Sequence, residues 1–188
     1  MSGKITNYVF KKRVHKHLKN QIRNKQFVNF DNAKSILLLF ESNYSEKNIE
    51  TKKIIQYLLK EGKKVTAWGF VDKKQIISAA YPEYRILHPK DLDLFNKPKN
   101  QLIQELLQYE YDLIIDISNR RIIPLDYIAL YANAKFKTGM QKDNLNLYDF
   151  AVDIENHLKT NEIQVEDLEF SFIFKQILFY LKNIQTND

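Results

Sequence analysis

Cysteine is absent from the 188-residue sequence, and glycine and proline are scarce, with four residues of each. Without a thiol the chain has no disulfide, no thiolate metal ligand and no cysteine nucleophile, and nothing marks an oxidising compartment. The glycines stand at positions 3, 62, 69 and 139, so neither G-x-G-x-x-G nor G-x-x-x-x-G-K-[ST] occurs. The sequence therefore argues against glycine-loop dinucleotide binding and against P-loop hydrolysis.

Long apolar runs are also missing: no stretch of about 18 apolar residues occurs, and the first 30 residues hold no apolar core of signal-peptide length. We expect a protein without a transmembrane segment that resides in the reducing cytoplasm. The four histidines, at positions 15, 17, 88 and 157, form no H-E-x-x-H frame, and no G-x-S-x-G elbow is present. We accordingly assign no catalytic residue, no metal ligand and no cofactor from the sequence.

Acidic residues are lacking in the first 30 positions, which carry eight Lys or Arg. The remaining 158 residues carry 21 Lys or Arg against 23 Asp or Glu, so the whole excess behind the net charge of +6 lies in the N-terminal segment. Within it Phe10, Val14, Leu18 and Ile22 recur at four-residue spacing. This pattern predicts an amphipathic helix over residues 6–26 with a single apolar stripe.

Cations cover the rest of the predicted helix. Such a concentration of positive charge favours a polyanion through counterion release, and RNA is the natural candidate in a cytoplasm. Two other interpretations stay open, namely a solvated face that only aids solubility and peripheral contact with an anionic membrane or an acidic protein. The residues expected to contact nucleic acid are Lys11, Lys12, Arg13, Lys16, Lys19, Arg23 and Lys25.

Alternating strand and helix patterns fill the rest of the chain. The runs SILLLFE (35–41) and KVTAWGFV (64–71) have strand length, and between them lies a helix that Asn43 or Ser45 caps and Gly62 ends. This order predicts a parallel βαβ unit with a right-handed crossover.

The run YDLIIDISN (111–119) is an unbroken apolar stretch that ends in a carboxylate, as expected of a central strand. The patterns predict helices over 99–110 and from Pro124, strands at 84–88 and 136–140, and an edge strand within 147–154. Asn161 with Gln164 is expected to cap the long final helix.

Together these elements predict one three-layer, Rossmann-like α/β domain over residues 31–188 with a mostly parallel sheet of five or six strands. Residues 1–30 would form the basic amphipathic N-terminal helix and its connector, and the long C-terminal helix would close the domain on one sheet face.

Polar side chains follow several of the predicted strands. In an open parallel sheet, ligands bind beyond the carboxyl ends of the strands, where the strand order reverses. Carboxylates, hydroxyls and arginine at these ends would suit an anionic or sugar-like ligand, whereas the alternative is that they are polar because loops are solvated. The candidate ligand-binding residues are Ser42, Asn43, Asp72, Asp116, Ser118, Asn119 and Arg120.

Two resemblances add to this interpretation. The stretch YDLIIDISNRRIIPLDYIALYANAKFKTGM (111–140) is similar to a strand, helix and strand in the N-terminal domain of heptosyltransferase-like glycosyltransferases, which implies a fold rather than an activity. Over most of the chain, AKSILLLF, EGKKVTAWGFVDKK, DLDLFNKP, YDLIIDIS and AKFKTG resemble an uncharacterised family of small bacterial α/β proteins, a domain of unknown function.

We therefore predict a non-catalytic interaction protein that binds RNA or a ribonucleoprotein, such as the ribosome, through its basic N-terminal helix. The alternative is a small-molecule-binding or glycosyltransferase-like α/β domain with its site at the strand ends.

Overall fold

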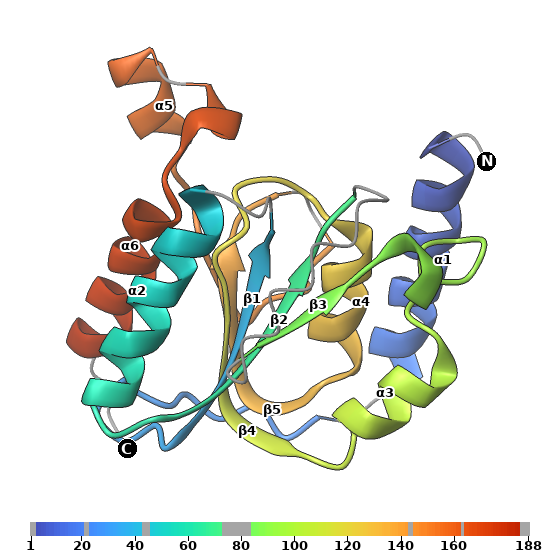
Figure 1. Ribbon diagram of the computed structural model, residues 1–188, viewed down its shortest axis with the longest axis horizontal. Helices are drawn as coiled ribbons and strands as arrows, with labels where there is room; N and C mark the ends of the chain where they lie inside the picture. Colours follow the sequence, from blue (N-terminus) through green and yellow to red (C-terminus); the bar gives the residue numbers. More distant parts are fainter. Residues whose placement is uncertain are drawn as a thin grey trace.

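A six-stranded parallel sheet forms the centre of the molecule, with helices on both faces (Figure 1). The computed structural model describes residues 3–20, 23–42, 46–72, 84–142, 145–162 and 164–184. The strands are β1 (Ser35–Glu41), β2 (Lys64–Phe70), β3 (Tyr84–Leu87), β4 (Glu110–Asp116), β5 (Asn133–Met140) and β6 (Phe150–Val152). The helices are α1 (Gly3–Asn20), α2 (Glu46–Lys60), α3 (Asn100–Leu106), α4 (Ile123–Tyr131), α5 (Glu155–Asn161) and α6 (Phe170–Asn183), with short 3-10 turns at Pro89–Asp91 and Val165–Asp167.

The strand order is β3-β2-β1-β4-β5-β6, so the chain starts in the middle of the sheet and builds outward in both directions. This is the arrangement of a doubly wound α/β fold, with its reversal of strand order between β1 and β4. The predicted α/β class and parallel βαβ unit are confirmed. Strand β4 pairs with both β1 and β5, and Leu113, Ile114 and Ile115 are fully buried, as expected of a central strand.

Alternate residues of the strands point to two separate cores. In β1, Ile36, Leu38 and Phe40 belong to the core beneath α2 and α6. Leu37 and Leu39 belong to the core beneath α4, which also includes residues of α1 and α3. Because successive side chains of a strand point to opposite faces, a β1 run that is apolar throughout requires cover on both sides.

The N-terminal helix packs on the body of the protein. Thr6, Phe10 and Val14 are buried, and the Phe10 ring meets the Tyr127 ring of α4 edge to face with centroids 4.9 Å apart. In Figure 1, α1 lies outside α4 on one side of the sheet, whereas α2 and α6 cover the other side. Two of the four residues of the predicted apolar stripe, Phe10 and Val14, therefore anchor α1. Of the other two, Leu18 is 42% exposed and Ile22 lies outside the described residues.

The predicted extent of this helix was wrong, because α1 ends at Asn20 and residues 23–29 are not helical. In that connector the Gln26 amide donates to the carbonyl of Lys135 at 3.2 Å, and the Phe27 ring packs against the Phe136 ring at 5.1 Å. The connector thus follows the start of β5 from the α4 face to the opposite face. These contacts with β5 override a helical pattern that contains no glycine or proline to stop it.

Two further boundaries differ from the sequence expectations. Helix α3 ends at Leu106 rather than near position 110, since Glu110 already pairs with Asn133 of β5. Asn161 does not cap the final helix: it is the last residue of α5, and α6 begins at Phe170. The proposed caps of α2, Asn43 and Ser45, lie outside the described residues. Gly62, with φ of 73°, ends the α2 region in the left-handed conformation, as predicted.

No helix within the described ranges is long and apolar enough to cross a membrane.

Candidate functional site

The outer face of α1 carries exposed lysines on the side away from α4. Because residues three or four apart share a helix face, Lys11, Lys12, Lys16 and Lys19 form one stretch of surface. None of these four lysines forms an ion pair with another residue in the described part of the chain, and α1 itself contains no acid. Tyr8 projects from the same face with 68% of its surface exposed. We call this surface, defined by Tyr8 and the four lysines, the basic face.

Arg13 has a different role from these lysines, because it fastens α1 to the body. Its guanidinium donates to the Tyr127 hydroxyl at 3.2 Å and lies 3.6 Å from the Asp93 carboxylate. It also lies over the ring of Phe95, 5.3 Å from the centroid. These contacts occupy a cation that the sequence assigned to the RNA-binding set.

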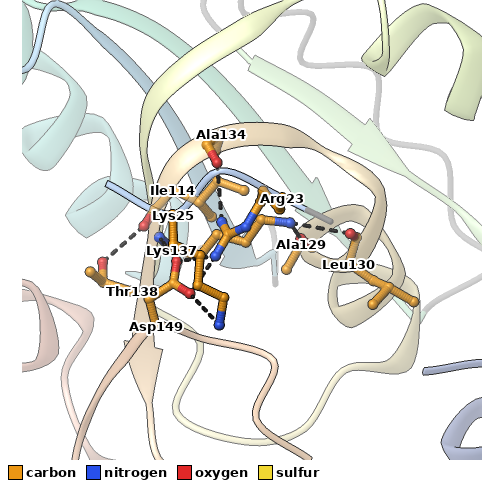
Figure 2. A network of polar contacts seen from close by, with 9 residues as sticks. All are labelled: Arg23, Lys25, Ile114, Ala129, Leu130, Ala134, Lys137, Thr138 and Asp149. Atoms are coloured by element: carbon orange, nitrogen blue, oxygen red, sulfur yellow. Dashed lines mark hydrogen bonds and ion pairs between the residues drawn. The ribbon is translucent and has the colours of Figure 1, made fainter. Parts of the chain in front are cut away.

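Arg23 and Lys25 are part of a polar group centred on Asp149 (Figure 2). Arg23 bonds both carboxylate oxygens of Asp149 and also donates to the carbonyl of Ala134 at 3.1 Å. Lys25 pairs with the same carboxylate at 3.2 Å, although its own side chain is 65% exposed. Asp149 also accepts the backbone amide of Lys137 at 2.9 Å. One carboxylate thus joins the connector after α1 to β5.

Lys137 of β5 completes this group and is only 4% exposed. Its ammonium nitrogen lies 2.6 Å from the carbonyl oxygen of Ala129 and 3.2 Å from that of Leu130, in the last turn of α4. Burial and the positive charges of Arg23 and Lys25 lower the pKa of Lys137 to about 7, against the opposing effect of Asp149. Figure 2 shows the Lys137 side chain reaching from β5 to these helix carbonyls.

The predicted strand-end residues lie at one edge of the sheet, since β2, β1 and β4 are neighbours. Arg120, after β4, pairs with Glu41 at the end of β1 and bridges the reversal point. The Ser42 hydroxyl is buried and lies 3.0 Å from the side-chain oxygen of Asn48. Asn119 is fully buried and donates to the carbonyl of Leu168 at 3.2 Å. Asn43 lies outside the described residues.

Asp116 is sealed inside the protein rather than facing a ligand cavity. Its carboxylate accepts the backbone amide of Ser118 at 2.8 Å and also the Ser118 hydroxyl. Its other oxygen accepts Lys142 at 2.6 Å and the Tyr148 hydroxyl. Burial, and then the neighbouring Asp116 charge, raise the pKa of Tyr148 well above its usual value. The observed contacts of Asp116 and Ser118 are structural, and their contact with a ligand stays a prediction.

Asp72 is exposed and, with Arg120, borders a 210 Å³ cavity beyond the ends of β2 and β4. The cavity also touches Arg121 and Pro124 at the start of α4. Both arginines already have carboxylate partners, Glu41 for Arg120 and Asp126 for Arg121. The charge at this edge is therefore largely neutralised within the protein.

Within the described ranges, no group of three or more His, Asp or Glu side chains could hold a metal ion.

Comparison with protein families gives a match to a family of unknown function, DUF6913, over residues 7–184. The chain belongs to this family. The comparison with curated proteins and the comparison with solved structures each gave no match.

Membership in DUF6913 confirms the resemblance to an uncharacterised α/β family and brings no activity with it. No comparison connects the chain with glycosyltransferases. Only the geometry of this chain therefore bears on its function.

Sequence reasoning missed the residues that organise the buried polar groups. The sequence patterns assign no functional role to Lys137, Tyr148 or Asp149, which lie within predicted strand segments, or to Lys142. The one available signal was a lysine inside the short apolar strand FKTGM (136–140), because a buried ammonium needs a partner. Nothing in the sequence indicates that the partners of this ammonium are carbonyl oxygens in the last turn of a helix.

Proposed function

We propose that the basic face of α1 binds RNA, either alone or within a ribonucleoprotein such as the ribosome. The observation that carries the proposal is the set of four exposed lysines on one helix face without an ion pair in the described part of the chain. Lysines that already pair with carboxylates would have to break those pairs before contacting phosphate, whereas these four need not. Their positive potential is therefore available to a phosphate backbone.

The packing of α1 favours RNA over a membrane surface. An amphipathic helix that lies in a bilayer interface inserts its apolar stripe between the lipids. In α1 that stripe is occupied, because Phe10 and Val14 are fully buried against the body. The aliphatic side chains that remain exposed, Ile5 and Leu18, lie about 140° apart around the helix and form no continuous apolar surface.

Tyr8 adds a contact that suits nucleic acid in particular. Its ring is 68% exposed on the lysine side of the helix and has no structural role in the core. Single-stranded RNA is commonly held by stacking of unpaired bases on exposed aromatic rings, with cations on the phosphates. The basic face therefore fits single-stranded or loop RNA better than a regular duplex.

The test is the salt dependence of RNA binding by the full chain. In a variant in which Lys11, Lys12, Lys16 and Lys19 are replaced by Gln, we expect the slope of log affinity against log salt to fall by up to about 3, because each phosphate contact to a single strand contributes about 0.7. Fluorescence anisotropy with a labelled single-stranded RNA between low and moderate salt measures this slope.

The matched control replaces four other exposed lysines by Gln, namely Lys53, Lys60, Lys64 and Lys175, which lie away from α1. This control has the same net charge as the test variant. If both variants lose the same affinity and slope, the effect reflects overall charge and the basic face is not the binding site. A Tyr8→Ala variant should weaken binding several-fold with an unchanged slope, since it removes stacking and no charge.

A further inference from the structure

A cavity lies at the junction of α1, its connector, the last turn of α4 and the segment before β6. Its volume is 350 Å³, and it is separate from the basic face and from the strand-end edge. Its polar lining consists of Arg23, Lys25, Lys137, Asn146 and Asp149, and its apolar lining of Leu18, Leu130 and Leu147. All three cations of the polar group described above therefore border one space.

The charge around this cavity is unbalanced. Among the described residues that line it, Asp149 supplies the single carboxylate against the basic side chains of Arg23, Lys25 and Lys137, and it pairs with the first two. Burying like charges together is unfavourable unless a counter-ion is present. The cavity thus retains a positive potential that its own carboxylate does not neutralise.

The hydrogen-bond inventory leads to the same conclusion. A lysine ammonium has three N-H donors, and Lys137 uses two of them on the carbonyls of Ala129 and Leu130. Lys25 uses its ammonium on Asp149 alone among the described residues. Donors therefore remain at the cavity for an additional acceptor.

We propose that this cavity binds a small organic anion, with a carboxylate or phosphate head group held by Lys137, Arg23 and Lys25. The apolar body of the ligand would lie against Leu18 and Leu130. A volume of 350 Å³ is at the small end of the range for ligand pockets, which is about 300 to 1,000 Å³, and exceeds what an inorganic ion needs. The ligand class is therefore an anion with a compact apolar group.

Binding should be coupled to the protonation of Lys137. The charged groups that act on its amine are Arg23 and Lys25 from the connector and Asp149 from the segment before β6, while α4 contributes only carbonyl oxygens. Burial and the charges of Arg23 and Lys25 keep the pKa of Lys137 at about 7. A bound anion would offset that repulsion and favour the ammonium form, so that binding takes up a proton near neutral pH.

The first experiment titrates the full chain with benzoate and with phenyl phosphate, followed by NMR chemical shifts of the Lys137 and Leu130 amides. Benzoate does not titrate between pH 6 and pH 8, so any pH dependence belongs to the protein. We expect its affinity to fall about tenfold from pH 6 to pH 8, because a group with a pKa of about 7 loses most of its proton over that interval. Benzyl alcohol, which lacks the charge, should not bind.

The two anions distinguish the possible ligand sources, since tighter binding of phenyl phosphate indicates a phosphate ester and tighter binding of benzoate indicates a carboxylate. If neither anion shifts the two amides at pH 6, the proposal is overturned. Binding with no change in affinity between pH 6 and pH 8 would overturn the part assigned to Lys137.

Variants provide an independent check. Lys137→Met keeps the aliphatic stem and should abolish benzoate binding, and Lys25→Gln, at a largely exposed position, should fold normally and weaken binding several-fold. Lys34→Gln, at an exposed lysine directly before β1 and outside the cavity lining, is the matched control and should bind as the unaltered chain does. If the Lys25 variant binds benzoate as tightly as the Lys34 variant and the unaltered chain do, the proposal is contradicted. This holds even if the Lys137 variant fails to fold.

This inference does not depend on the RNA proposal. Replacing the four lysines of the basic face by Gln should leave benzoate binding unchanged, because none of them lines the cavity. The two proposals can therefore fail separately.

Discussion

The basic face of α1 and the pair of Arg23 with Asp149 both use cations from one basic segment of the sequence, yet the surroundings of these cations differ. The lysines of the basic face are exposed and have no ion pair within the described ranges. Arg23 is 13% exposed and is bonded to Asp149, whose side chain is 7% exposed. The first set contributes potential to the surface and little to stability, while the second fixes the connector to the sheet. A count of positive charges in a sequence thus says little about how many are available to a partner.

The largest expected effect comes from removing the carboxylate at the centre of the buried group. Asp149→Ala leaves the Lys137 amide without its acceptor and Arg23 with only the carbonyl of Ala134, and we expect it to lower the free energy of unfolding by about 3 kcal/mol, as is typical when one partner of a buried ion pair is deleted. Urea denaturation measures this value.

The comparison variant for Asp149→Ala is the one with all four lysines of the basic face replaced by Gln, for which we expect a change within about 0.5 kcal/mol. Comparable losses in the two variants would show that the basic face also has a structural role.

A pH series sharpens the comparison further, because burial lowers the pKa of Lys137 into the range near neutrality, where it changes stability. The pKa of Lys137 falls from 10.5 to about 7 on folding. Between those values the unfolded chain holds a proton that the folded chain lacks, so raising the pH stabilises the fold by up to about 1.4 kcal/mol per pH unit. We expect the unaltered chain to gain stability relative to Lys137→Met between pH 7 and pH 9.

Chemical denaturation of both proteins at several pH values provides this difference. Parallel stability curves would mean that Lys137 keeps its ammonium charge in the fold throughout this range. The exposed Lys12→Met substitution serves as the control, because it makes the same exchange of lysine for methionine outside the buried polar group.

The smallest expected effect separates two neighbouring cations of α1. Arg13→Ala removes the hydrogen bond to Tyr127 and the contact with Asp93, and should lower the free energy of unfolding by about 1 kcal/mol. Lys12→Ala, one residue away on the basic face, should change it by less than about 0.5 kcal/mol. Thermal or urea unfolding of the pair tests the division of α1 into an anchoring side and a free side, and equal effects would contradict it.

Local patterns were sufficient to predict the sheet because its signals are strong and contiguous. The run at 111–119 covers all of β4 except its first residue, and β4 lies between β1 and β5 as expected of a central strand. The strand, helix and strand over 35–71 form the parallel unit that their order required. The edge position of β6 also follows from its alternating pattern.

Helix ends and polar partners were less predictable because distant residues determine them. The helical pattern of the N-terminal segment continues to position 26, but contacts with β5 hold residues 23–29 in a non-helical connector. Likewise, Asp116 reads as a ligand-facing carboxylate at a strand end, whereas Lys142 and Tyr148 come back to it from later in the chain. Neither partner lies within the range of any local pattern.

The sequence by itself determined the α/β class, the parallel unit, the central strand and the location of the basic excess, because these depend on hydrophobic periodicity and on composition. Tertiary structure alone decided which cations of the N-terminal segment stay exposed and which are consumed by carboxylates. It also brought Arg23, Lys25 and Lys137 to one cavity. The physical reason is that the electric field at a charged side chain depends on the groups around it in space. Folding brings Arg23 and Asp149 together although they are more than a hundred residues apart in the sequence.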